Sequence, residues 1–440
     1  MTAPSTSTTR STAAGFGRRF HHLWAASAAS NLADGVILLA APLLAIQLTR
    51  SPALVAGVTV AFTLPQTVAA VPAGVLADRA PRARVIAVAN LLRMVAAGGL
   101  AAAAGTGGLT LAILYAGVAL IGAAEMTADT TTHAAIPQVV ERGRLAAANS
   151  RIQGTQIALN DFVGAPLAGL LVATAAVAAL ALPAVLFGLA ALLVLRVATP
   201  RPAPRPGSSL RGDVVEGIAF MWRSHLVRDL AVAAAVCNLA STAFFSVLVL
   251  HAVAPGPMGL DESAYGLLIA AVALGAIGGA VLAERLERLL GLAVIFRAGV
   301  ALGAAVFALP IATSQAWALG GAFVVLGAVG MCLNVALACL RQLLIPDALL
   351  GRVTGAARLI AMGSVPLGGV IGGVIGSSAG LPAVFAFASL TLLAALVFLR
   401  RVTSEVVAAA RRTAEDQPAD SARTPRPDRR GTPPAATGTS

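Results

Sequence analysis

Three carboxylates stand inside long apolar stretches of the sequence: Asp34, Glu125 and Asp161. Each lies about ten to twelve residues from the near end of its stretch, which in a helix is a depth of about 15–18 Å. A charged group near the bilayer centre costs about 2.5–3.5 kcal/mol on insertion scales, so such groups face a protein interior and mark ion or substrate pathways. Because burial favours the neutral form of a carboxyl group, we expect these acids to line a cavity and exchange protons there. The alternative is that they are hydrogen-bonded anchors between helices.

Other polar residues fall at similar depths. Arg93 lies about 12 Å into its apolar stretch, and we expect it to form a structural or gating pair with Asp129, which follows Glu125 by one helical turn. Five uncharged residues are further candidates for the cavity lining: Asn31, Gln153, Asn160, Asn238 and Asn334. The second half of the chain contributes few charges, so the sequence favours proton coupling in the first half.

The composition places these residues in a membrane. Of the 440 residues, 58% are hydrophobic and 11% are charged, against roughly 25% charged in a soluble domain. The mean hydropathy is +0.85. The net charge of +12 comes from arginines scattered between apolar runs, which argues against a nucleic-acid face. The sequence contains no lysine, which excludes a P-loop or Schiff-base lysine and disfavours an ATP-driven pump.

The sequence contains no pattern typical of a metal or cofactor site. Cys237, Cys332 and Cys339 lie in apolar segments without the spacing of metal ligands, and the five histidines form no zinc motif. We expect no cofactor, no metal and no enzymatic activity. Gly376–Gly380 fits the nucleophile-elbow pattern, but it follows no strand and has no histidine or acid partner in the sequence.

Twelve apolar stretches are long enough to cross a bilayer as helices of about 20 residues. Their approximate ranges are 22–46, 52–77, 85–104, 109–135, 149–174, 177–198, 227–253, 262–285, 290–312, 315–340, 354–377 and 381–401. Nearly all arginines between them fall on one side if the N-terminus is cytoplasmic, and Arg50 alone falls on the other. The positive-inside rule therefore predicts a multi-pass protein of the cell (plasma or inner) membrane with both termini in the cytoplasm.

The two halves of the chain resemble each other in order. Three short matches recur about 200 residues apart: Asn31–Ala33 with Asn238–Ala240, Val75–Arg79 with Val281–Arg285, and Pro166–Gly169 with Pro366–Gly369. We interpret them as an internal repeat. The predicted segments are a cytoplasmic N-terminal segment (1–20), a first bundle (21–198), a cytoplasmic linker with an amphipathic helix (199–226), a second bundle (227–401) and a disordered cytoplasmic tail (402–440). The fold class is then all-α and membrane-embedded, with twelve helices in two pseudo-symmetric six-helix bundles.

The loop after the second apolar run holds a glycine, an acid and clustered arginines: Gly74, Asp78, Arg79, Arg82 and Arg84. It resembles the signature loop of the major facilitator superfamily (MFS). The resemblance implies that the acid docks on a neighbouring helix N-terminus and that the basic residues latch the two halves on the cytoplasmic side. An anion gains there from the helix dipole and free N–H groups. Pro81 and Ala83 depart from the family's usual glycine and basic residue.

A second set of residues resembles the MFS branch of bacterial siderophore and macrolide exporters. The set comprises Gly122–Glu125, Asp129, Ile136–Pro137, Leu145–Asn149 and Asn160–Gly164. The series Gly164, Pro166 and Gly169 also resembles the helix-packing motif of antiporters in this superfamily, and Pro366 is its counterpart in the second half.

These resemblances imply a monomeric secondary transporter that exports a small amphipathic molecule, such as a drug, siderophore or secondary metabolite, in exchange for protons by alternating access. Its partners would be that substrate, protons and the lipid bilayer. The alternatives are an importer of a small solute with the same fold and, in a different class, a membrane sensor or enzyme. The motifs do not specify the direction of transport.

Overall fold

The computed structural model describes residues 16–197, 210–345, 347–401 and 405. Twelve of its helical spans are long and apolar enough to cross a membrane, which confirms the predicted fold class. The described residues contain no sheet, and their only β-type pairing is an isolated bridge between Val253 and Leu260. The N-terminal segment to residue 15, part of the predicted linker and nearly all of the predicted tail lie outside the described residues.

Seven α-helices and two shorter elements make up the first half, which we call the N half. They are α1 (Arg18–Leu48), α2 (Pro52–Arg79), α3 (Arg82–Gly105), α4 (Leu111–Val139), η1 (Arg142–Arg144), α5 (Leu145–Gln156), η2 (Ile157–Gly164), α6 (Ala165–Thr174) and α7 (Ala176–Leu195). The consecutive elements α5, η2 and α6 form a single membrane span, Leu145–Thr174.

The second half, or C half, contains the remaining six spans. They are α9 (His225–Ala252), α10 (Glu262–Leu290), α11 (Leu292–Ala312), α12 (Ala316–Leu344), α13 (Asp347–Ala379) and α14 (Leu381–Leu399). The short helix α8 (Leu210–Arg223) occupies the predicted amphipathic segment and packs on α13 and α9. Its Met221 is buried with Val353 and Ala357 of α13, so α8 belongs structurally to the C half.

Local sequence signals explain where several spans begin and end. Thr110 caps α4 by accepting a hydrogen bond from the Ile113 N–H (3.3 Å), and Pro52 stands in the first turn of α2, where its missing N–H costs nothing. Gly291 and Gly380 adopt φ values of +77° and +82°, a region open mainly to glycine. These two residues allow the tight connections between α10 and α11 and between α13 and α14.

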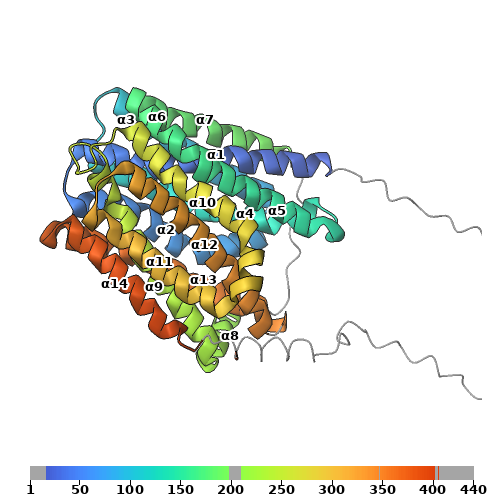
Figure 1. Ribbon diagram of the computed structural model, residues 1–440. Coiled ribbons are helices and arrows are strands. Elements are labelled where there is room, and N and C mark those ends of the chain that lie inside the picture. The colour runs from blue at the N-terminus through green and yellow to red at the C-terminus, as the bar shows by residue number, and fades with distance from the viewer. Residues whose placement is uncertain (1–15, 198–209, 346, 402–404, 406–440) are drawn as a thin grey trace, which may run out of the picture.

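The two halves pack side by side, as Figure 1 shows, with α1, α3, α6 and α7 grouped apart from α9, α11, α13 and α14. Two helix pairs make most of the contact between them: α2 with α13, and α6 with α10. Because successive spans are joined by short connections, their ends alternate between two sides. We call the side that holds Arg18, Arg79 and Leu195 the termini side, and the side that holds Leu48 and Pro52 the far side.

The close contacts between the halves lie towards the far side. Gly373 on α13 packs against Ala53 of α2, and Gly376 packs against Pro52. The Ala53 N–H donates to Ser377 Oγ (3.0 Å), and Arg50 donates to the Ala254 carbonyl (2.9 Å). Small residues permit such close helix approach. The far side of the interface is therefore closed in this structure.

Helix α10 begins at this far side with a capping acid. The Asp261 carboxylate accepts hydrogen bonds from Ser263 Oγ (2.6 Å) and the Ala264 N–H (2.7 Å). These bonds favour the ionised form and hold the pKa of Asp261 below its usual range. The next residue, Glu262, contacts Gln47 of the N half (3.5 Å), so the start of α10 is tied to both its own first turn and the other half.

Candidate transport site

An ion pair lies buried in the middle of the N half. Arg93 of α3 contacts the Asp34 carboxylate of α1, and the two side chains are 0% and 4% exposed. Arg93 also donates to Ser30 Oγ (2.8 Å) and lies over the Phe187 ring, 4.1 Å from its centroid. Breaking such a pair by removing one partner leaves an uncompensated buried charge. Asp34 is thus fixed by a cation and does not stand open in a cavity.

This pair corrects the predicted partner of Arg93. The sequence places Arg93 and Asp129 at similar depths on neighbouring spans, but in the structure the guanidinium turns towards α1 and contacts Asp34. Asp129 and Glu125 act on Arg93 only as nearby charges. The charges of Arg93, of His133 and of Arg358 in the C half act on Asp129, but none of them forms an ion pair with it among the described residues.

Glu125 of α4 is held by a neighbouring helix. Gln66 of α2 donates a hydrogen bond from Nε2 to Glu125 Oε2 (3.0 Å), and the Glu125 side chain is half-buried. An amide N–H can donate to a protonated or an ionised carboxyl group. Glu125 is therefore an acid whose support by Gln66 does not depend on its being charged.

Asp161 lies on an irregular part of the fifth span. The eight residues of η2 form a π-helix, a rare conformation that is frequent at functional sites. Here α1 approaches closely: a side chain at Gly35 would meet the Asn160 backbone, and one at Gly164 would meet Gly35. Asp161 is exposed and lines a cavity of about 190 Å³ whose walls include Phe245 of α9 and residues of α10. Asp161 thus faces a space shared by both halves.

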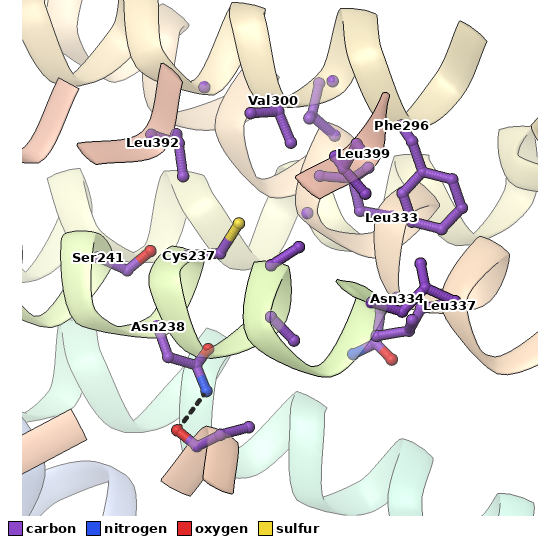
Figure 2. Close-up of a pocket in the computed structure, with 18 of the residues that line it drawn as sticks. Cys237, Asn238, Ser241, Phe296, Val300, Leu333, Asn334, Leu337, Leu392 and Leu399 are labelled. Atoms are coloured by element: carbon purple, nitrogen blue, oxygen red, sulfur yellow. Dashed lines mark hydrogen bonds between the residues drawn. The ribbon is translucent and has the colours of Figure 1, made fainter. Parts of the chain in front are cut away.

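A large cavity lies within the C half. Its volume is about 400 Å³, and residues of α9, α11, α12, α13 and α14 line it. Figure 2 shows Cys237 and Ser241 of α9 pointing towards Val300, Leu333 and Leu392 across this cavity. Most of the lining is apolar. The cavity extends from the termini side, at Leu230 and Arg341, towards the middle of the bundle at Phe307.

The five predicted polar lining residues fall in different places. Asn31 lines a small cavity beside Asp129 and donates to the Ser27 carbonyl (2.7 Å), whereas Gln153 is exposed on α5. Asn160 joins Asp161 at the cavity between the halves. Asn238 and Asn334 both line the large cavity of the C half, although Asn238 donates to the Ala361 carbonyl (3.0 Å) and points away from Cys237 (Figure 2).

The signature loop is not engaged with the C half in this structure. Asp78, Arg79 and Arg84 are exposed, and Asp78 forms no hydrogen bond or ion pair with any residue in the described part of the chain. A side chain at Gly74 would meet only open space. Arg82 is the one signature-loop arginine that is not exposed. It donates a hydrogen bond to the Ala134 carbonyl of α4 (2.6 Å) and so ties the loop to the N half.

The predicted packing residues lie at helix contacts. A side chain at Gly169 on α6 would meet the Glu262 carbonyl of α10, and Gly266 of α10 packs on Pro166. This contact joins the two halves, whereas Gly164 packs on α1 within the N half. Pro366 is buried inside α13.

Sequence reasoning missed several partners of these groups. Ser30, Gln66 and Phe187 surround the N-half charges, but nothing in their spacing distinguishes them from other residues of apolar helices. Arg358 carried a clearer signal. It lies four residues inside the predicted span 354–377 and about 16 Å along α13 from the first residue of that helix, where a charged residue is costly.

Comparison with known proteins identifies the class that this architecture indicates. The family model described as "transmembrane secretion effector" matches residues 11–432. The chain therefore belongs to this family of MFS transporters, and it is a multi-pass membrane transporter and not an enzyme. A curated relative, the multidrug efflux pump Tap of Mycobacterium tuberculosis (strain H37Rv), is 30% identical over 377 residues, which cover 80% of this chain and 85% of the relative. Tap of Mycobacterium bovis matches equally well.

Solved structures show the same fold. A mutant form of the nucleoside transporter NupG superposes with a TM-score of 0.74 at 12% identity, covering 87% of this chain and 99% of the other. A bacterial homologue of the iron transporter ferroportin, solved in an inward-facing state, gives a TM-score of 0.64 at 20% identity, covering 88% and 99%. At these identities the likeness supports the architecture and carries nothing about substrate.

Proposed function

We propose that this protein is a proton-coupled exporter of a small amphipathic molecule, acting as a monomer in the cell membrane with both termini in the cytoplasm. The observation that carries the proposal is the concentration of membrane-buried acids in the N half, around Arg93. The similarity to a multidrug efflux pump supports export, and the placement of the arginines supports the orientation.

In this orientation the termini side is cytoplasmic and the far side is outside. The structure then corresponds to an inward-open state, because the halves are in close contact on the far side. A substrate would enter from the cytoplasm. Rocking of one half against the other would open the far side, as in other transporters built from repeats. Closure of the termini side would bring Asp78 to the N-terminus of α13, where an anion is stabilised by the helix dipole.

Protons would move through the acids of the N half in the opposite direction. In the outward-open state a carboxylate of the set Asp34, Glu125 and Asp161 takes a proton from outside, and in the inward-open state it releases that proton to the cytoplasm. Glu125 suits this cycle because Gln66 supports both of its protonation states. Protonation of Asp34 would instead weaken its ion pair with Arg93 and free α1 to move relative to α3.

Two experiments test this proposal. A strain lacking the gene, screened for drug sensitivity and lost secretion across a compound panel, would identify a transported compound. In proteoliposomes with an internal pH dye, movement of that compound should then drive protons the opposite way, and Asp34→Asn and Glu125→Gln should abolish this flux. Unchanged substrate-driven proton flux in both variants would contradict the coupling, and net accumulation of substrate in intact cells would identify an importer.

A further inference from the structure

The large cavity of the C half has a positively charged entrance and no negative charge of its own. Arg341 of α12 lines its end towards the termini side, and Arg358 of α13 lines it farther into the bundle. None of the described residues that line it is an aspartate or a glutamate. The volume of about 400 Å³ is within the range of small-molecule sites, which are typically about 300–1,000 Å³.

Arg341 has no acidic partner among the described residues. It is half-buried, and neither a hydrogen bond nor an ion pair joins its side chain to another residue in that part of the chain. Burial of a guanidinium without a counter-ion is unfavourable. The site would therefore gain from an anion supplied by a ligand.

Arg358 stands farther into the bundle and is partly balanced from the other half. Its side chain is exposed at the cavity, and its charge acts on Asp129 of α4 without an ion pair between the two side chains among the described residues. The two arginines thus differ: Arg358 is shared with the N half, whereas Arg341 belongs to the cavity alone. Arg341 is the stronger anchor for a ligand anion.

The deeper part of the cavity fits an apolar body with a few polar contacts. Phe296, Leu333 and Leu392 line it (Figure 2). Asn334 lies two turns before Arg341 on the same face of α12, and its side chain makes no hydrogen bond within the described residues. Phe307, at the inner end, is stacked on Phe244 with ring centroids 4.4 Å apart, so one of its faces is occupied.

From this arrangement we propose that the C-half cavity binds an amphipathic anion, with its carboxylate or phosphate group on Arg341 and Arg358 and its apolar body against Phe296, Leu333 and Leu392. The inference rests on the proposed transport function and names its substrate class. The described lining offers no acid to hold a cation, and an apolar cavity alone would not require the arginines. The anion comes either from a soluble solute or from an anionic lipid, which share this chemistry.

The test compares ligands that share an apolar skeleton and carry an anionic, a neutral or a cationic head group. Purified full-length protein in phosphatidylcholine nanodiscs is titrated with tritiated 1-naphthaleneacetate in a scintillation proximity assay. The neutral 1-naphthaleneacetamide and the cationic 1-naphthylmethylamine serve as competitors. A second set of carboxylate, amide and amine with a biphenyl skeleton tests whether the result depends on the naphthalene ring. Because charge-assisted hydrogen bonds are roughly twice as strong as neutral ones, the carboxylates should bind about tenfold more tightly than the amides.

Variants of the two arginines then test which residue causes the preference for carboxylates over amides. Arg341→Gln should remove most of it, Arg341→Lys should keep part of it, and Arg358→Gln should reduce it. The matched control is Arg223→Gln on α8, which makes the same charge change outside the cavity lining. Thermal unfolding without ligand checks that each variant is folded. Equal binding of carboxylates and amides in both sets, or an unchanged preference in both Arg341→Gln and Arg358→Gln, would overturn the proposal.

A lipid arm identifies the source of the anion. Competition by phosphatidylglycerol in the nanodisc, but not by phosphatidylcholine, identifies a lipid ligand, and its absence identifies a solute; both outcomes keep the anion site. Because binding is measured without transport, the two proposals can fail separately. An exporter of neutral compounds without charge preference would contradict the anion site only.

Discussion

The two halves of this transporter are built on the same helix arrangement but differ in what they bury. The N half encloses the Arg93–Asp34 pair together with Glu125 and Asp129, and its cavities, one beside Asp129 and one between α1 and α2, have volumes of only about 10 Å³ and 80 Å³. The C half encloses a cavity of about 400 Å³ without an acid among the described residues of its lining. The comparison indicates a structural division. The charge cluster around Arg93 lies in the N half, whereas the C half holds the larger cavity, and its own buried acid, Asp229, is paired with Arg401 outside that cavity lining.

A physical reason supports this division. Charges in a low-dielectric interior are tolerable only when they are paired and hydrogen-bonded, which requires dense packing around them. A large ligand cavity requires the opposite. Separating the charge cluster from the cavity allows each half to satisfy its own requirement.

The largest expected effect comes from breaking the buried pair. Arg93→Ala leaves Asp34 buried without a cation, and removing one partner of a buried pair costs about 3–5 kcal/mol. We expect a strongly lowered unfolding temperature in detergent and no transport. The double variant Arg93→Met/Asp34→Leu should recover stability but not proton-coupled transport. A normal unfolding temperature for Arg93→Ala would contradict the structural role of the pair.

The close approach of α1 to the π-helix gives the next effect. A side chain at Gly35 would meet the Asn160 backbone, and overpacking of this kind costs about 1–3 kcal/mol. Gly35→Ala should therefore lower both the unfolding temperature and the transport rate. Gly99→Ala, on α3, is the matched control, because a side chain there meets nothing within 4 Å. Equal behaviour of the two variants would show that the contact is unimportant.

A third pair of variants separates coupling from substrate binding. Glu125→Gln should lower pH-driven transport at least about tenfold, or about 1.4 kcal/mol, while leaving substrate binding intact. Asn334→Leu in the C-half cavity should change the substrate affinity but leave the number of protons moved per transported molecule unchanged. Flux and binding measured on the same proteoliposomes distinguish these outcomes. Loss of binding in Glu125→Gln would argue against the division between the halves.

The smallest effect concerns one of the exposed ion pairs of the C half. Arg352 of α13 contacts Glu216 of α8 (2.7 Å), and the two side chains are 41% and 52% exposed. Exposed pairs contribute about 0.2–1 kcal/mol and are screened by salt. Glu216→Gln should therefore shift the unfolding temperature slightly, and only at low ionic strength. A shift as large as that of Arg93→Ala would contradict the contrast between exposed and buried pairs.

Much of the architecture could be predicted from the sequence, because a bilayer imposes length and hydropathy on every span. The site was harder. Counting residues along a helix gives the depth of Arg93, Asp34 and Asp129, but not the direction in which each side chain points around the helix axis. Asp34 and Asp129 are both plausible partners by depth, and the packing of α1 and α3 on the same helix, α7, brings Asp34 to Arg93.

The sequence by itself determined the membrane class, the number of crossings, the family and the depth of the acids. Only the tertiary structure decided which acid pairs with Arg93, that Asp161 lies on a π-helix beside Gly35, and that Arg341 and Arg358 meet at one cavity. The reason is that hydropathy and helical rise act along one chain segment at a time. Pairing and cavity shape depend instead on helix rotation, which results from many weak contacts between segments far apart in the sequence.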